Sequence, residues 1–348
     1  MERRRAASGL LVQELKDQVD NVVLCSEASK MAIFCAKNNI QHYTQKKRGG
    51  FDLSYALRIK SICKLENISC VQLHDAHAHT YAILAAVLGN QVPLILSRRV
   101  DFPIKDNFFS SFKYNHAAIK RILCVSNTIK EITSKGINDS SKLFTVYSGI
   151  DLTKFEQRTG ELRKELGLDE NTFLIGNTSA LADHKDYFTF LDVAEKLAAR
   201  NDSCHFVVMG DGPMKAEIHQ YAARKKLDHR ITFTGFRNDI PKVLAELDLF
   251  LITSKTEGLG TSILDAFACK VPVVGTKGGG IIELIEHEKT GLLCEVKNVE
   301  QIQLAVEKMM TEVDLRNTVV KNASEKVQLF SKEETAKQTL NHYLAVSR

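Results

Sequence analysis

Glycines, hydroxyl side chains and two carboxylates are concentrated in one short run of the second half of the chain. An apolar segment, residues 249–253, is followed by Ser254-Lys255-Thr256-Glu257-Gly258-Leu259-Gly260-Thr261-Ser262-Ile263-Leu264-Asp265. We expect a buried strand, a glycine turn and then a helix. The N–H groups and the dipole of such a helix end bind anions, and glycine lets a ligand approach closely. The run therefore predicts a diphosphate site at Gly258, Leu259, Gly260 and Thr261.

Two acidic residues, Glu257 and Asp265, lie on either side of this predicted phosphate site. Carboxylates repel phosphate but accept hydrogen bonds from hydroxyl groups, so we expect both to face sugar hydroxyls. The alternative is that they are acidic residues favoured near a helix N-terminus by the helix dipole alone.

Other expected strand ends carry similar loops. Residues 205–209 lead into Gly210-Asp211-Gly212-Pro213, which fits either a close approach to a ligand or a plain strand-to-helix turn. Residues 271–275 lead into a loop that contains Gly278-Gly279-Gly280, without the G-x-G-x-x-G pattern of NAD-binding proteins. Lys185, in the loop after residues 173–177, has the charge to neutralise a diphosphate, although a lone lysine is commonly a surface residue.

Strand-like and helix-like segments alternate almost throughout, which predicts parallel βαβ units with helices on both faces of each sheet. The alternation breaks near Asp151 and then restarts, and the chain is helical from about residue 299 onward. We expect an α/β fold of two Rossmann-like, doubly wound domains that face a cleft. The first spans residues 1–151, the second spans residues 152–325, and residues 326–348 form a C-terminal helix.

Composition limits the function classes. The chain has 348 residues and no apolar run of the about 20 residues that cross a bilayer, and no signal-peptide core follows the basic start. Its eight cysteines form no C-x-x-C pair, so we expect free thiols rather than zinc ligands or disulfides. No Asp-x-Asp motif stands at a strand end, so we expect no metal and no cofactor. These features predict a cytoplasmic protein.

Charge is unevenly distributed. Residues 1–150 contain 21 Lys and Arg against 12 Asp and Glu, a net +9, and the remainder has a net −4. A basic first half suits an anionic partner, either a phosphorylated acceptor or a membrane surface, and the alternative is a solvated surface without a partner. Nucleic acid is not expected, because Trp is absent and no aromatic-plus-basic recognition motif is present.

The stretch from residue 176 to 295 resembles glycosyltransferase family 4, the retaining glycosyltransferases of the GT-B fold. The similar pieces are "SALADHKDY", "VVMGDGPMKAEI", "ITFTGFRNDIP", "TSKTEGLGTSILDAFACKVPVVGTKGGGIIELI" and "TGLL". In the first half, "VQLHDAHAHT", "LSRRVDFPIK", "CVSNTIKE" and "VYSGIDLTKF" share family features, so that the resemblance covers about residues 21–325. "SRRVDFP" is similar to enzymes that build bacterial surface glycans such as lipopolysaccharide.

The resemblance implies a role for each candidate donor residue. Lys185 would hold the donor diphosphate, Glu257 would contact the donor sugar, and Asp265 would bind the ribose. Residues 233–237, which include Phe236 and Arg237, would lie beside the nucleotide base.

The resemblance also implies roles in the first half of the chain. His74 would lie near the reacting sugar, as a catalytic residue with Glu257 and Lys185, although His77 and His79 compete for that role and a structural histidine is the alternative. Arg98 and Arg99 stand at an expected strand end and are candidates for phosphate or acceptor contact.

Three departures from the family pattern bear on turnover. Ala180 stands where the family usually has Arg, and Asp265 stands where it usually has Glu. The family also begins with a strand and a Gly-rich loop, whereas this chain begins in the helix that should follow them. We therefore expect residues 6–18 to be helical, with Leu10, Leu11 and Leu15 on one face. We expect the first sheet to have either a gap or two neighbouring strands that close across it, and the chain to be the product of a truncated or misassigned reading frame.

The sequence thus predicts a retaining, metal-independent, hexosyl-type glycosyltransferase that uses a nucleotide-sugar and a glycan or glycolipid acceptor. It would act in lipopolysaccharide or related glycan synthesis, either free in the cytoplasm or in peripheral contact with the inner face of the membrane. The alternatives are a non-catalytic or truncated homologue that binds a nucleotide-sugar, and a nucleotide-sugar epimerase of similar architecture.

Overall fold

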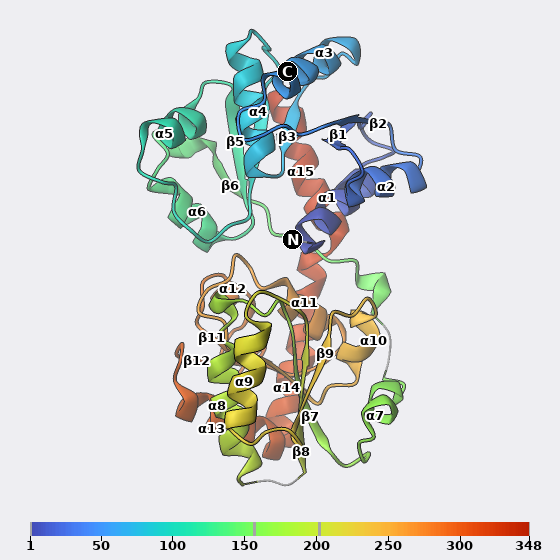
Figure 1. Ribbon diagram of the computed structural model, residues 1–348, viewed down its shortest axis with the longest axis vertical. Coiled ribbons are helices and arrows are strands. Elements are labelled where there is room, and N and C mark those ends of the chain that lie inside the picture. The colour runs from blue at the N-terminus through green and yellow to red at the C-terminus, as the bar shows by residue number, and fades with distance from the viewer. Residues whose placement is uncertain (1, 156–157, 201–202, 348) are drawn as a thin grey trace. The chain divides into compact units, whose positions relative to one another are not determined.

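The computed structural model describes residues 2–155, 158–200 and 203–347, and it divides into two compact α/β units (Figure 1). Unit 1 comprises residues 1–149 and 331–348, and unit 2 comprises residues 150–330. The division falls within two residues of the expected boundary at 151. The expected C-terminal helix, residues 326–348, is in fact helix α15 (Lys332–Val346), which belongs with unit 1.

Unit 2 is built on one parallel sheet of six strands. In spatial order it runs β12-β11-β10-β7-β8-β9, and every pairing is parallel. The strands are β7 (Phe173–Thr178), β8 (Cys204–Met209), β9 (Ile231–Gly235), β10 (Leu249–Ile252), β11 (Val273–Thr276) and β12 (Leu292–Cys294). Each overlaps an expected strand. The chain therefore starts in the middle of the sheet, builds outward on one side, and then crosses to the other side.

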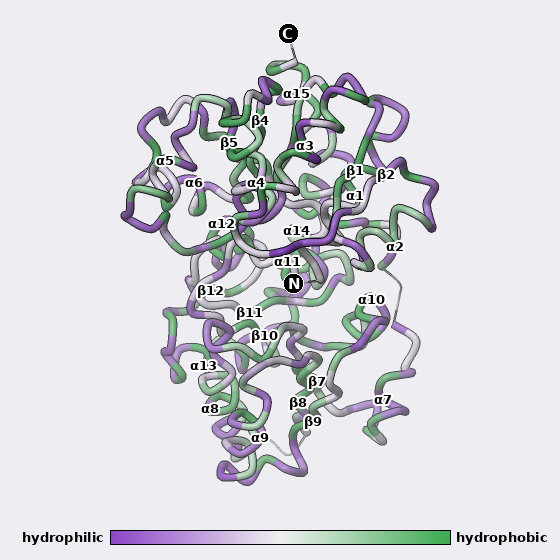
Figure 2. The backbone as a smooth tube through the Cα atoms, turned by 45° about the horizontal axis from the view of Figure 1, so that its top comes forward, coloured by the Kyte–Doolittle hydropathy of each residue, from purple (hydrophilic) through white to green (hydrophobic). Residues whose placement is uncertain are grey.

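Helices cover this sheet because its apolar β-branched and aromatic side chains must be buried on both faces. Tyr187, Phe190, Phe206 and Leu251 belong to its main core cluster and are almost fully buried. The tube in Figure 2 is green along much of these strands and purple at many outer turns. The helices are α7 (Glu161–Leu166), α8 (Tyr187–Ala198), α9 (Lys215–Arg224), α10 (Ile240–Ala245), α11 (Thr261–Ala268), α12 (Ile281–Leu284), α13 (Val299–Thr311) and α14 (Val313–Lys326), with 3₁₀ turns η2 (Leu152–Lys154), η3 (Asp183–Lys185) and η4 (Val327–Phe330).

Unit 1 contains two parallel sheets. Strands β1 (Val23–Ser26) and β2 (His42–Gln45) pair with each other, and the second sheet has the order β3-β4-β5-β6. Its strands are β3 (Val71–Leu73), β4 (Leu94–Arg98), β5 (Ile119–Cys124) and β6 (Leu143–Thr145). Within the described ranges, no strand pairing joins the two sheets. The polar strand β2, "HYTQ", has no apolar alternation and was not expected from the sequence.

The helices of unit 1 are α1 (Glu2–Glu14), α2 (Lys30–Lys37), α3 (Leu53–Leu65), α4 (Ala76–Val87), α5 (Phe108–Asn115), α6 (Asn127–Ser134) and α15, with one 3₁₀ turn, η1 (Ser140–Lys142). Helix α1 packs against α15 through Leu11, Leu15 and Ala336. Tyr343 of α15 also packs on β4 and β5 and donates a hydrogen bond to Gln72 Oε1. Among the described residues, no helix is both long enough and apolar enough to span a membrane.

Candidate active site

Strand order in unit 2 creates the candidate site. Strand β7 lies between β8 and β10. The chain runs from β7 to β8 on one side and from β10 to β11 on the other, so the loops that follow the neighbouring strands β7 and β10 diverge. In open parallel sheets, ligands bind beyond the carboxyl ends of strands at this switch point. The loop after β7 carries Lys185 and the loop after β10 carries Glu257, so the fold brings together two residues that are 72 positions apart.

Lys185 and Glu257 form a direct ion pair. Lys185 Nζ donates to Glu257 Oε1 at 2.5 Å, and Ser254 Oγ donates to the same oxygen at 2.9 Å. The lysine side chain is 15% exposed and the glutamate side chain 11%. Both side chains are therefore largely shielded from solvent at the carboxyl edge of a parallel sheet. There the cation can bind a phosphate, and the carboxylate can accept a hydrogen bond from a hydroxyl.

The backbone beside Lys185 is fixed from the neighbouring strand. Thr253 Oγ1 donates to the Asp186 carbonyl at 3.0 Å, and Asp186 adopts the left-handed conformation with φ 49°. Lys255 N donates to the His184 carbonyl at 2.8 Å, and Lys255 Nζ pairs with Asp183 at 2.8 Å. Sequence reasoning missed these supporting residues, although Thr253 and Lys255 lie within the run that carries Glu257.

The glycine loops of unit 2 pack on one another. A Cβ at Gly210 would lie 1.9 Å from the Ser179 carbonyl oxygen, and one at Gly212 would lie 2.4 Å from that of Leu181. Gly279, with φ 61°, approaches the Glu257 backbone in the same way, at 2.4 Å. Gly210 and Gly212 were expected to bind the donor, and close backbone packing between loops accounts for both. The glycine loop after β11 likewise supports the backbone of Glu257.

Helix α11 begins at Thr261, four residues after Glu257. Gly260 precedes its first turn with φ 87°, a conformation that favours glycine, and Asp265 lies in the second turn and is 9% exposed. The Leu259 side chain is 3% exposed, so it belongs to the core and only its backbone could serve a ligand. Gly258 lies in the turn before α11 and Thr261 is its first residue, so the positive end of the helix dipole closely follows Glu257 in the chain.

Arg237 and Phe236, which the resemblance places beside the base, have different environments. The Arg237 guanidinium forms ion pairs with Glu165 at 2.6 Å and Asp239 at 2.7 Å, and these hydrogen bonds raise its pKa. The Phe236 side chain is 57% exposed. Arg237 is therefore already engaged by two carboxylates, whereas the Phe236 ring is accessible.

The three histidines of "LHDAHAHT" are distinguished by their contacts. His79 is 1% exposed, its Nε2 lies 3.1 Å from the Lys113 carbonyl, and its ring packs against Tyr114. His77 is exposed on α4. His74, directly after β3, has a buried Nδ1 that no described residue meets with a hydrogen bond. Buried polar atoms are normally paired, so His74 is the histidine that the geometry leaves open for a ligand.

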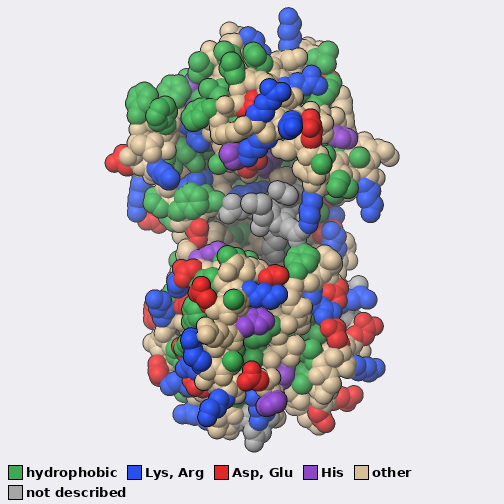
Figure 3. All heavy atoms as spheres, viewed as in Figure 1, with side chains coloured by type: hydrophobic (Ala, Val, Ile, Leu, Met, Phe, Trp, Pro, Cys, Tyr) green, Lys and Arg blue, Asp and Glu red, His purple; other side chains and the backbone are tan. Residues whose placement is uncertain are grey.

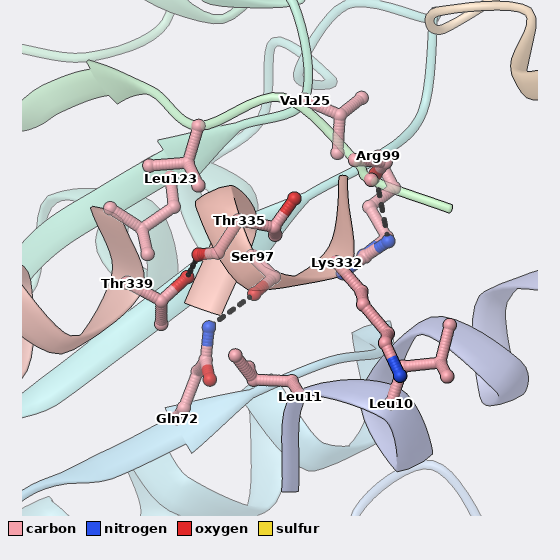
Figure 4. A pocket seen from close by; sticks show the side chains of 13 residues that line it. Leu10, Leu11, Gln72, Ser97, Arg99, Leu123, Val125, Lys332, Thr335 and Thr339 are labelled. Atoms are coloured by element: carbon pink, nitrogen blue, oxygen red, sulfur yellow. Dashed lines mark hydrogen bonds between the residues drawn. The ribbon is translucent and has the colours of Figure 1, made fainter. Parts of the chain in front are cut away.

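The two arginines at the end of β4 point to different partners. Arg98 is 5% exposed, donates to Tyr114 Oη at 2.9 Å and to the Phe102 carbonyl, and stacks on both rings. These contacts give Arg98 a structural role. Arg99 donates to Ser148 Oγ at 3.1 Å and lines a cavity of about 30 Å³ within unit 1 (Figure 4). Its charge helps to lower the pKa of His74, so these two residues share one environment.

The cavity beside Arg99 is small and polar on one side. Its volume is sufficient for about two water molecules. The other lining residues come from α1, the carboxyl ends of β3 to β6, and α15, and they are Leu10, Leu11, Gln72, Ser97, Leu123, Val125, Val146, Ser148, Gly149, Lys332, Thr335 and Thr339. Within the part of the chain that the structure describes, no group of three or more His, Cys, Asp or Glu residues is arranged to hold a metal ion.

Replacing His74 by alanine is expected to lower turnover roughly tenfold to hundredfold, the value of one hydrogen bond to a buried group, and to leave donor affinity almost unchanged. Burial first, and then the charge of Arg99, lower the pKa of His74 to about 3, so its imidazole stays neutral between pH 5 and 8. The loss should therefore be the same at pH 6 and pH 8. Steady-state kinetics of H74A, with H77A as the matched control, tests this, and a larger loss in H77A would assign the role to His77.

Comparison with known proteins places these features in a wider group. The profile described as "Glycosyl transferases group 1" matches residues 159–326, and the profile described as "Glycosyltransferase Family 4" matches residues 10–154. The chain is 25% identical over 324 residues to N-acetyl-alpha-D-glucosaminyl L-malate synthase of Bacillus anthracis, which covers 91% of this chain and 85% of that protein. It is 26% identical over 292 residues to the UDP-Gal:alpha-D-GlcNAc-diphosphoundecaprenol alpha-1,3-galactosyltransferase of Escherichia coli, with 79% and 75% covered.

Solved structures share the fold. A glycosyltransferase from Rickettsia africae superposes with a TM-score of 0.86 and 21% identity, over 99% of this chain and 94% of that one. Anabaena HepE in complex with UDP and glucose superposes with a TM-score of 0.84 and 20% identity, over 98% and 96%. Both matches extend over nearly the full length of this chain, so they include both of its α/β units.

Proposed function

The chain belongs to glycosyltransferase family 4 and has the GT-B fold, and from that premise we propose that it moves a sugar from a nucleotide-sugar to an acceptor hydroxyl. The observation that carries the proposal is the Lys185–Glu257 pair at the switch point, with Glu257 four residues before the start of α11. A cation and a helix N-terminus beside a carboxylate suit a ligand that joins a diphosphate to a sugar. The similarity to HepE, which was solved with UDP and glucose, supports this class of donor.

In the proposed reaction, the bond between the sugar's anomeric carbon and the diphosphate oxygen breaks. The diphosphate leaves with the bonding electrons, and Lys185 and the first turn of α11 stabilise its charge. The acceptor oxygen bonds to the anomeric carbon and passes its proton to the departing diphosphate oxygen. Glu257 would hold the donor-sugar hydroxyls and Asp265 the ribose, so that catalysis depends on positioning and charge stabilisation.

We further propose that the transfer retains the anomeric configuration. We also propose that it needs no metal ion, because Lys185 and the α11 N-terminus supply positive charge at the diphosphate. The acceptor would be a glycan or glycolipid of a bacterial surface polymer such as lipopolysaccharide, reached from the cytoplasm at the inner face of the membrane. The Escherichia coli relative, whose name includes a diphosphoundecaprenol-linked acceptor, supports an acceptor of this kind.

Labelled nucleotide-sugars test the proposal. We expect one of them to give labelled glycan product, at a rate that EDTA leaves unchanged, and its nucleoside diphosphate to raise the melting temperature of the protein. Binding without transfer would instead support a non-catalytic nucleotide-sugar-binding homologue. Release of an epimerised nucleotide-sugar would support an epimerase. A rate that EDTA abolishes and Mg²⁺ restores would contradict metal independence.

A further inference from the structure

Unit 1 has a contiguous aromatic surface that its own core does not use. Four phenylalanines and one leucine, from the loop and first residue of α3 (residues 51–53) and from α5, are each 46–77% exposed. We call this surface the aromatic patch, and its members are Phe51, Leu53, Phe108, Phe109 and Phe112. Figure 3 shows hydrophobic side chains gathered over α5, at the upper left of the view, with Lys and Arg beside them. Grouped exposed apolar residues mark interaction surfaces, whereas single ones are ordinary.

The rings of the patch contact one another. The Phe51 and Phe109 centroids are 6.5 Å apart in an edge-on arrangement, and Phe108 stacks on Phe112 at 6.3 Å. These contacts join two segments that are distant in the sequence, the loop before α3 and the helix α5. Helix α5 itself buries none of its residues. The patch is therefore one group of exposed rings that joins a loop and a helix.

Exposed cations surround the patch. Lys46, Lys47 and Arg48 are exposed immediately before the Gly49-Gly50 turn that leads to Phe51, and exposed Lys105 lies three residues before Phe108. Asp52, within the same loop, is 4% exposed and turned inward, where it accepts hydrogen bonds from the Arg48 and Tyr55 backbone. Asp106 is an exposed acidic residue beside Lys105.

The wider charge of unit 1 has the same sign. Residues 1–149 and 331–348 contain 24 Lys and Arg against 14 Asp and Glu, a net +10. The immediate surroundings of the rings are therefore basic, and so is the unit that carries them.

We propose that the aromatic patch docks unit 1 onto an anionic lipid bilayer. Aromatic rings are stable at the boundary between headgroups and acyl chains, and nearby Lys and Arg are attracted to anionic lipid phosphates. Exposed rings with exposed cations close to them in the sequence suit such a surface. The inference deepens the proposed function, since a glycolipid acceptor would be presented at such a surface, but lipid binding itself requires no turnover.

Vesicle sedimentation with the full chain tests the proposal. We expect the protein to bind vesicles of phosphatidylcholine mixed with phosphatidylglycerol, and to bind vesicles of phosphatidylcholine alone at least tenfold more weakly. The F108S/F109S double variant should lose at least tenfold in affinity for the anionic vesicles. The K46S/K47S/R48S triple variant should lose roughly a hundredfold, because each of the three cations near an anionic surface contributes about fivefold. High salt should weaken binding of the unaltered chain.

The matched control is L304S/L329S, which removes two exposed apolar side chains of unit 2, 61% and 68% exposed, and should bind as the unaltered chain does. Circular dichroism and the melting temperature establish that each variant is folded. The proposal is overturned if the unaltered chain binds neither kind of vesicle, or if F108S/F109S binds anionic vesicles as tightly as the control. If the unaltered chain binds anionic vesicles but transfers no sugar, only the proposed function is contradicted.

Discussion

The K185A variant is expected to bind the donor and its nucleoside diphosphate, probed with UDP because the similar HepE structure contains it, roughly tenfold to hundredfold more weakly than the unaltered chain. A charge-assisted hydrogen bond to a largely buried group contributes about 1.5–3 kcal/mol, which corresponds to that range. The substitution also leaves the Glu257 carboxylate, 11% exposed as a side chain, without the cation that neutralises it. That carboxylate would then repel the incoming diphosphate. Isothermal titration calorimetry with UDP measures the effect directly.

The matched control for this prediction is K255A. Lys255 lies in the loop after β10 and also pairs across to the loop after β7, with Asp183 at 2.8 Å, but its side chain is 29% exposed. A more exposed ion pair is worth less, about 0–1 kcal/mol, so K255A should weaken UDP binding by less than about fivefold. Equal UDP affinity in K185A and the unaltered chain would remove Lys185 from the diphosphate site.

The E257Q variant is expected to lower transfer roughly a hundredfold and to bind free UDP at least as tightly as the unaltered chain. Glu257 Oε1 accepts hydrogen bonds from Lys185 and from Ser254, so a diphosphate must compete with Glu257 for the lysine. An amide keeps the shape but removes the charge, which should strengthen UDP binding by up to about fivefold. The donor sugar loses a charge-assisted partner, worth about 1.5–3 kcal/mol in the transition state.

The D265N variant provides the contrast. It makes the same carboxylate-to-amide change in the second turn of α11, where the family role is to bind the ribose, so it should weaken UDP binding itself. Calorimetry and turnover of both variants separate the two roles. If E257Q and D265N lose UDP affinity to the same extent, the division between a sugar contact and a ribose contact is wrong.

Local sequence pattern was sufficient for much of the fold. The alternation of apolar strands and amphipathic helices predicted the parallel α/β architecture, and each strand of unit 2 overlaps its expected position. The polar strand β2 was not predicted, because its pairing with β1 defines it and its sequence has no hydrophobic alternation. The sequence predicted a C-terminal helix over residues 326–348 but not its packing on unit 1, because its partners, such as Gln72, lie more than 250 residues away.

For the candidate site, the sequence predicted the residues but not the contacts between them. Lys185 and Glu257 were expected from their loops, but their direct contact follows from the adjacency of β7 and β10, which only the strand order determines. Arg98 and Arg99 are consecutive and looked equivalent, yet one is held by Tyr114 and Phe102 and the other lines a cavity. Side-chain direction in a strand alternates between faces, but the partners on each face come from distant segments.

Unit 1 is assembled from both ends of the chain, and this affects how the protein can fold during synthesis. Gly149 lies so close to the start of α15 that a Cβ there would be 2.1 Å from the Ser331 carbonyl oxygen, and α15 supplies Tyr343 to the sheet. Domains usually fold from the N-terminus as the ribosome releases them. Here the continuous unit 2 is complete at residue 330, whereas unit 1 lacks a helix of its core until residues 331–348 emerge. Unit 2 can therefore finish folding before unit 1, whose earlier residues remain exposed to chaperones until α15 is available.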